Sequence, residues 1–168
     1  GPRPSLHISQ QRDLPLGSTA ERAVRWSVPL CVRLGSADGS TRHCALVEPK
    51  TAELQLPVAA CPSWVMPNAD GAGYLRFTQP APDRAALEAA FGGLDDREQL
   101  MVADSAVAAF RAGQLSVPEL LNAVPRIAAS RGWPAASVPV DTLKWMRDQL
   151  ANEPDRPALD ALLRRVYG

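Results

Sequence analysis

The sequence predicts an α+β protein in two segregated parts: a small antiparallel β-sandwich, then antiparallel α-helical hairpins that would start a helical, repeat-like bowl. Residues 1–80 contain short runs that alternate apolar and polar positions and are interrupted by proline and glycine, a pattern typical of short strands. Residues 83–168 space apolar side chains three and four positions apart, as amphipathic helices do. We therefore expect a β-sandwich domain over 1–80 and an α-helical domain over 83–168.

The strand pattern is clearest in the middle of the first part. Residues 26–34 and 43–47 alternate apolar and polar side chains, and the segment between them, 35–40, contains an Asp-Gly pair. Such a pair between two alternating runs predicts a β-hairpin. Further strands are expected over three shorter runs: 6–9, 52–58 and 73–78.

The first helices carry clear start and stop signals. Asp83 is expected to cap a helix that contains Leu87 and Phe91. Two capping boxes predict the next helix starts, because Ser or Asp followed three residues later by Glu satisfies the first backbone N–H groups. One is Asp95 with Glu98, and its helix should align Leu100, Ala103, Val107 and Phe110 before ending at Gly113. The other is Ser116 with Glu119, and its helix should bury Leu120, Val124 and Ile127 and be kinked by Pro125.

Two further helices are expected in the last third of the chain. Asp141 is the predicted cap of one that aligns Leu143, Met146 and Leu150. Asp155 or Pro157 begins the other, whose apolar face consists of Leu159, Leu162, Leu163 and Val166. Because a helical array needs a polar closing element, we expect the natural chain to continue. The last helix would then leave an apolar patch that favours self-association.

Composition excludes some classes of partner. The chain carries 18 basic and 18 acidic residues, so it has no broad positive field for nucleic acid or an anionic membrane. No apolar run approaches the roughly 18 residues that a membrane-spanning helix needs. We expect neither nucleic acid nor membrane as a partner, and the compartment, cytoplasmic or periplasmic, stays open.

The three cysteines leave two alternatives. Cys31, Cys44 and Cys61 do not have the spacing of a metal site. They are either small buried apolar residues, or two form a disulfide and one thiol remains. The second alternative would indicate an oxidising compartment.

The residues that could perform chemistry predict no site in this chain. His7 and His43 belong to separate strand-like runs, and neither is followed by the H-E-x-x-H spacing that places two zinc ligands on one helix face. Ser9, two residues after His7, shares its face because strands place alternate residues on one side, so we do not interpret it as a nucleophile. The glycine-rich residues 70–73 lack the G-K-[ST] of a phosphate loop and indicate a turn. We expect no catalytic, cofactor-binding or metal-binding residue.

Four segments resemble one enzyme family. Trp64, Asn68, Gly73-Tyr74, Arg76 and Phe77 resemble the W-x-x-x-N…G-Y-Y-R end of the β-sandwich domain in zinc aminopeptidases of the aminopeptidase N and puromycin-sensitive type, with Leu75 in place of the second tyrosine. Asp96-Arg97, Leu100, Asp104 and Ala112-Gly113 resemble the signature that comes after it. Residues 8–12 and 26–30 resemble the first strands of the same sandwich. The resemblance covers about residues 6–113.

The resemblance implies a larger parent protein, and the Ala and Arg bias of the chain points to a bacterial source. Such a metalloprotease is a hydrolase that removes N-terminal residues from peptides, with zinc held by upstream domains. This chain would be a non-catalytic C-terminal segment that supports and caps their active site, so its partners would be its own catalytic domain and the parent's peptide substrates. Alone it should be inactive. The alternative is an independent β-sandwich and helical-repeat module that binds a protein partner.

Overall fold

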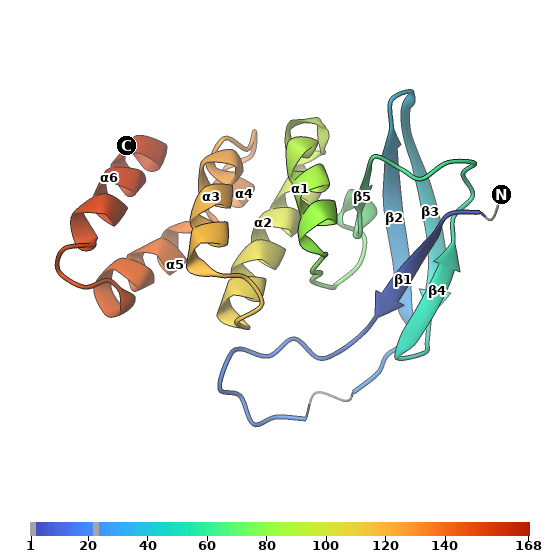
Figure 1. Ribbon diagram of the computed structural model, residues 1–168, viewed down its shortest axis with the longest axis horizontal. Coiled ribbons are helices and arrows are strands. Elements are labelled where there is room, and N and C mark those ends of the chain that lie inside the picture. Colours follow the sequence, from blue (N-terminus) through green and yellow to red (C-terminus); the bar gives the residue numbers. More distant parts are fainter. Residues whose placement is uncertain (1–2, 22–23) are drawn as a thin grey trace. The chain divides into compact units, whose positions relative to one another are not determined.

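The computed structural model describes residues 3–21 and 24–168, in which antiparallel strands precede a series of helices (Figure 1). The predicted α+β class with antiparallel sheets is confirmed. The chain divides into two compact units: a first unit that ends at Gly93 and a second unit that begins at Leu94. Among the described residues, no helix is both long and apolar enough to span a bilayer.

The strands of the first unit form two small antiparallel sheets. In one, β1 (Ser5–Ser9) pairs with β4 (Thr51–Gln55). In the other, β2 (Val28–Ser36) lies between β3 (Gly39–Val47) and β5 (Trp64–Met66). Alternate residues of both sheets meet in one apolar core, as expected for face-to-face packing. The buried members are Leu30, Val32, Leu34, Val47 and Leu56, against which Leu6, Ile8, Ala52 and Leu54 pack.

The predicted hairpin is present, with a tighter turn than expected. Ser36 pairs with Gly39, so only Ala37 and Asp38 form the turn and the strands extend into the segment predicted as loop. Gly39 comes next with a φ of 132°, a backbone angle that residues other than glycine rarely adopt.

Gly35 in β2 is required by its neighbour. It pairs with Trp64 of β5, and a Cβ at this position would overlap the indole ring. The guanidinium carbon of Arg33 lies 5.1 Å from the centre of the same ring, within the range of a cation–π contact. The absence of a side chain at Gly35 therefore allows the indole to cover the strand.

The expected strand over 73–78 is wrong. The third strand of the larger sheet is β5, and a 3₁₀ turn, η1 (Ala69–Gly71), comes after it. The side chain of Asn68 bonds both the N–H and the C=O of Gly73, so these groups are not available to a strand partner. Residues 73–80 then run without regular structure.

The first helix starts earlier than predicted. It is α1 (Ala81–Ala89), with Pro80 at the N-cap, so Asp83 lies in its first turn and does not cap it. Pro82 is tolerated because the first helical N–H groups have no partner within the helix. Leu87 is buried and α1 packs on β5. The change from strands to helix thus falls at 80–81, while the compact unit extends through a 3₁₀ turn, η2 (Phe91–Gly93).

The cysteines adopt the second of the two alternatives. Cys31 and Cys44 are directly opposite each other on β2 and β3 and form a disulfide. Cys61 is free and exposed. The interpretation of all three as buried apolar residues is therefore wrong, because opposed strand positions bring two of them together.

The second unit begins with the two helices whose capping boxes the sequence contains. They are α2 (Asp96–Arg111), capped by Asp95 and Glu98, and α3 (Val117–Ala128), capped by Ser116 and Glu119. Both boxes are confirmed. Gly113, at φ 71°, ends α2. There the Gln114 N–H donates to Ala109 O at 2.8 Å, the bond that closes a Schellman motif.

The predicted fourth helix has a different construction. A short helix that was not expected, α4 (Trp133–Ser137), precedes α5 (Val140–Trp145), and Pro139 rather than Asp141 holds the N-cap position. The chain continues as a π turn, η3 (Met146–Leu150). The additional residue in a π turn rotates the side chains beyond it about the helix axis. Leu143 and Met146, before and at the start of this turn, are buried, while Leu150 at its end is exposed.

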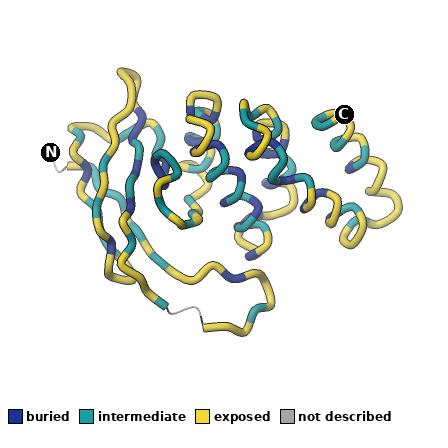
Figure 2. The backbone as a smooth tube through the Cα atoms, turned by 180° about the vertical axis from the view of Figure 1, so that it is seen from behind, coloured by how far each residue is buried: buried dark blue, intermediate teal, exposed yellow. Residues whose placement is uncertain are grey.

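The apolar face of the last helix, α6 (Arg156–Tyr167), is covered within its own unit. Leu159 is buried, and Leu162, Leu163 and Val166 are half-buried against the core of α2, α3 and α5. The expected apolar patch on this helix is thus wrong, because residues of the facing helices pack against it. The core consists of Val107, Ala109, Leu115, Leu120, Val124, Leu143, Met146 and Leu159, and Figure 2 shows buried and exposed positions alternating along these helices.

Polar contacts also hold α6 against the rest of the second unit. The Arg147 Nε donates to Asp160 Oδ1 at 2.6 Å and its Nη1 to Asp148 Oδ1 at 2.7 Å. The hydrogen bond from Arg147 lowers the pKa of Asp160 and raises the pKa of Arg147. The Tyr167 hydroxyl donates to the Ala136 carbonyl at 2.9 Å, and partial burial raises the pKa of that hydroxyl.

Adding a methyl group at Gly35 should destabilise the first unit. Gly35→Ala places a Cβ into the Trp64 indole, and such overpacking costs about 1–3 kcal/mol. Gly92→Ala is the control, because a Cβ there meets no atom within 4 Å. Denaturant unfolding followed by intrinsic tryptophan fluorescence measures both. Equal stability of the two variants would contradict the close contact.

The Asp160 ion pair should contribute to stability only above acidic pH. Its folded pKa is lowered, so its stabilisation is present above the unfolded value of about 4 and is lost as pH falls through the folded value. Asp160→Asn should therefore be less stable than the parent chain at pH 7, and the difference should shrink on acidification. Unfolding curves from pH 7 to pH 2 test this. The exposed Glu153→Gln should show no such convergence.

Candidate functional site

The residues that the sequence analysis weighed for catalysis do not form a catalytic arrangement. His7 lies on β1 and His43 on β3, in different sheets. A shallow depression along β1 and β4 does bring His7 and Ser9 near Glu53. However, the Glu53 carboxylate accepts from Ser5 Oγ at 2.6 Å, and His7, Ser9 and Glu53 are all exposed. A solvated carboxylate engaged elsewhere does not orient an imidazole as a triad requires.

The resemblance segments instead contain side chains that hold irregular backbone. Asn68 is 1% exposed. Its Nδ2 donates to the Gly73 carbonyl at 2.8 Å, and its Oδ1 accepts from the Gly73 N–H at 2.8 Å. The amide thus replaces a backbone partner on both sides of one residue. It closes the loop over 68–73, inside which Asp70 has a φ of 59° and Gly71 a φ of 60°.

Gln10 fulfils the same role after β1. Its Oε1 accepts from the Trp26 N–H at 2.8 Å, and its Nε2 donates to the Trp26 carbonyl at 2.9 Å. The same Nε2 lies 3.2 Å from Glu48 O and 3.1 Å from Pro49 O. One side chain therefore connects the approach to β2 with the turn between β3 and β4.

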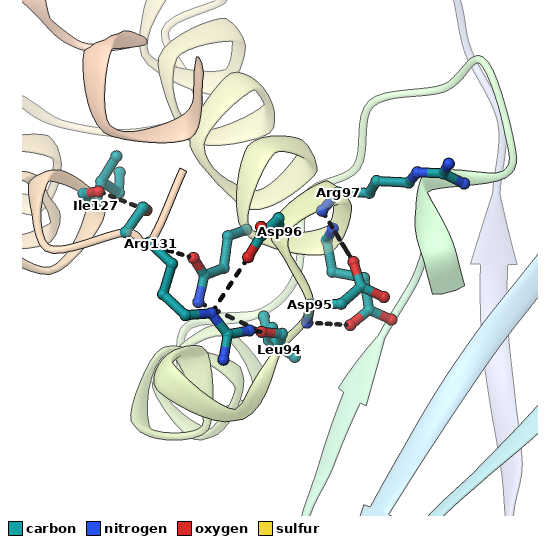
Figure 3. Close-up of polar contacts among 9 residues, drawn as sticks. Leu94, Asp95, Asp96, Arg97, Ile127 and Arg131 are labelled. Carbon is teal, nitrogen blue, oxygen red and sulfur yellow. Dashed lines mark hydrogen bonds and ion pairs between the residues drawn. The ribbon is translucent and has the colours of Figure 1, made fainter. Parts of the chain in front are cut away.

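In the second unit, a polar network surrounds the start of α2 (Figure 3). The Asp95 carboxylate accepts from the N–H groups of Arg97 and Glu98, each at 2.9 Å. In return, Glu98 accepts from the Asp95 N–H at 3.2 Å. Acceptors at this end of a helix satisfy backbone donors, and their negative charge interacts favourably with the helix dipole.

Arg131, in the turn between α3 and α4, completes this network. Its Nη2 donates to the Leu94 carbonyl at 2.6 Å and its Nε to Asp96 Oδ1 at 3.2 Å. The buried Gln99 donates to the same Leu94 carbonyl at 3.3 Å and accepts from the Arg131 N–H at 3.3 Å. The network joins two segments more than thirty residues apart in the sequence, and its geometry serves to position backbone rather than to transfer a proton.

Sequence reasoning identified some of these residues without their roles. Asn68 and Gln10 lie in segments quoted for the resemblance, and Asp95 was identified as a cap. Arg131 and Gln99 were not singled out for this contact. A polar residue such as Gln99 at a buried position of an amphipathic helix is a signal that could have pointed to it. Its partner, across a turn, leaves no local pattern.

Comparison with known proteins found no family profile and no curated protein that matches this chain. The assignment of a function therefore depends on the residues and their geometry.

Removing the Gln99 amide should destabilise the second unit. Gln99→Ala leaves the Leu94 carbonyl and the Arg131 N–H with fewer partners in a buried place, which costs about 1–3 kcal/mol. Gln149→Ala, at an exposed position, is the matched control and should stay within about 0.5 kcal/mol of the parent chain. Hydrogen exchange at the start of α2 locates the effect. Exchange that stays as slow as in the control would contradict the positioning role.

Proposed function

We propose that this chain is a non-catalytic segment of a zinc metallo-aminopeptidase that resembles the aminopeptidase N family. In that role it supports and caps an active site supplied by other domains of the parent protein. The order of the four resemblance segments and the confirmed order of strands before helices support this proposal. In such an enzyme the zinc would be held by the upstream domains, and the two histidines of this chain lie in different sheets.

The proposal rests on the hydrogen bonds that side chains of the resemblance segments make to backbone groups. Gln10 and Asn68 each bond two or more backbone groups in an irregular segment. These are the tasks of a supporting scaffold, which must hold loops in place without reacting. Residues with this task would give the segments a recognisable pattern without taking part in catalysis.

The second unit also exposes side chains suited to contact another domain. Trp133 is 69% exposed, Trp145 51% and Leu150 51%. Tryptophan is enriched among the residues that dominate protein interfaces. In the proposed parent protein these side chains would meet the catalytic domain.

The test is reconstitution with the coding region that precedes this chain. We expect an H-E-x-x-H motif within about two domain lengths upstream, and the joined polypeptide should release an anilide from N-terminal alanine or leucine. Replacing the motif glutamate should abolish release, while the 168-residue chain alone should neither hydrolyse the anilide nor retain zinc after dialysis. Hydrolysis by the chain alone that survives a His7/His43 double substitution would contradict the proposal, as would the absence of the motif.

One observation favours the alternative, an independent module that binds a protein partner. The outer side of α6 is polar: Arg156, Arg164 and Arg165 are exposed while the apolar side packs on its own unit. A polar outer helix is what a finished helical array presents. Light scattering against concentration separates the two functions. A module should remain monomeric at high concentration, whereas a segment with side chains exposed for another domain should self-associate. A catalytically active fusion would exclude the module.

A further inference from the structure

The disulfide lies on the outer face of the β2–β3 hairpin. Cys31 and Cys44 are paired in the strand register, opposite the core positions Leu30 and Val32 of the neighbouring residues in β2. Cys44 is an exposed residue and Cys31 a half-buried one. One sulfur can therefore be reached from solvent while the fold is intact. Disulfide exchange requires such access.

A cation lies beside the less accessible sulfur. Arg42 Nη2 is 3.3 Å from Cys31 Sγ. The guanidinium is held there by an ion pair between its Nε and Asp70 Oδ2, 2.9 Å apart. Since a nearby positive charge lowers the pKa of a thiol, Arg42 would stabilise a thiolate at Cys31. A thiol with a lower pKa is the better leaving group in exchange.

We propose that Cys31 and Cys44 form a reversible thiol–disulfide exchange site whose substrate is a dithiol reductant. A thiolate of the dithiol attacks Cys44 Sγ and forms a mixed disulfide there. The Cys31–Cys44 bond breaks, and its electron pair leaves on Cys31 as a thiolate beside Arg42. The second thiol of the dithiol, as its thiolate, then attacks the mixed disulfide and releases the Cys44 thiolate. The chain gains two electrons, the thiolates take up the two protons that the dithiol lost, and the dithiol becomes a cyclic disulfide.

The backbone makes this exchange reversible. The strands pair from Val28 with Val47 to Ser36 with Gly39, so a long backbone ladder joins them in addition to the sulfur bond. The two thiols would stay opposed after reduction, and an oxidised dithiol could restore the bond. The exchange would thus change the stability of the hairpin and leave its register in place.

The experiment counts thiols in the folded chain. Alkylation with N-ethylmaleimide followed by mass spectrometry should label Cys61 alone before reduction. After brief treatment with dithiothreitol in native buffer, all three cysteines should be labelled. Labelling of Cys31 or Cys44 without reductant, or resistance of the bond until the chain unfolds, would overturn the proposal.

Variants test the role of Arg42 and exclude reduction through unfolding. Arg42→Gln should slow native reduction by about three- to tenfold, Arg42→Lys should largely restore the rate, and the exposed Arg12→Gln should leave it unchanged. An unchanged rate in Arg42→Gln would overturn the assignment of Cys31 as the leaving sulfur. If Gly35→Ala accelerates reduction in proportion to its loss of stability, the bond is reached only by unfolding and the proposal is wrong.

Discussion

The need to pair buried backbone groups governs the first unit, and the Asn68 side chain meets it where no strand can. Two short sheets cannot be connected without irregular segments, and each unpaired N–H or C=O in such a segment costs free energy when buried. Asn68 supplies a donor and an acceptor to Gly73, which holds the loop after β5 closed. The chain can then leave the sheet and reach Pro80, where α1 begins. Gln10 supplies a donor and an acceptor to Trp26 in the same way.

The second unit solves the same problem at its helix ends. Capping boxes begin α2 and α3, and Gly113 allows the chain to turn back after α2. Gln99 and Arg131 then satisfy the Leu94 carbonyl across the turn between α3 and α4. The side chains with a clear purpose in both units thus act on backbone. These contacts are the observations from which we propose a scaffold role.

Local signals allowed much of this fold to be predicted. Capping boxes and the Asp-Gly turn act over a few residues, so α2, α3 and the β2–β3 hairpin could be placed from sequence. Misplaced elements depended on distant partners. Residues 73–78 alternate like a strand, but Asn68 occupies the backbone groups of Gly73, and the strand is β5. Likewise Asp141 has the residue type of a cap, but a π turn and Pro139 set the helix. Disulfide pairing and the Arg131 network lie across strands or turns, where sequence spacing carries no information.

The contact between Trp64 and Gly35 has a spectroscopic consequence. Trp64 is partly shielded by the β2 backbone and by Arg33, whereas Trp133 and Trp145 in the second unit face solvent. An indole that loses a fixed, partly dry environment on unfolding changes its emission more than one already in water. Trp64 would therefore dominate the change in intrinsic fluorescence, so that this signal tracks the melting of the first unit. Far-UV circular dichroism, to which helices contribute most, would track the second. Two inexpensive optical signals can thus reveal whether the units unfold together or in sequence.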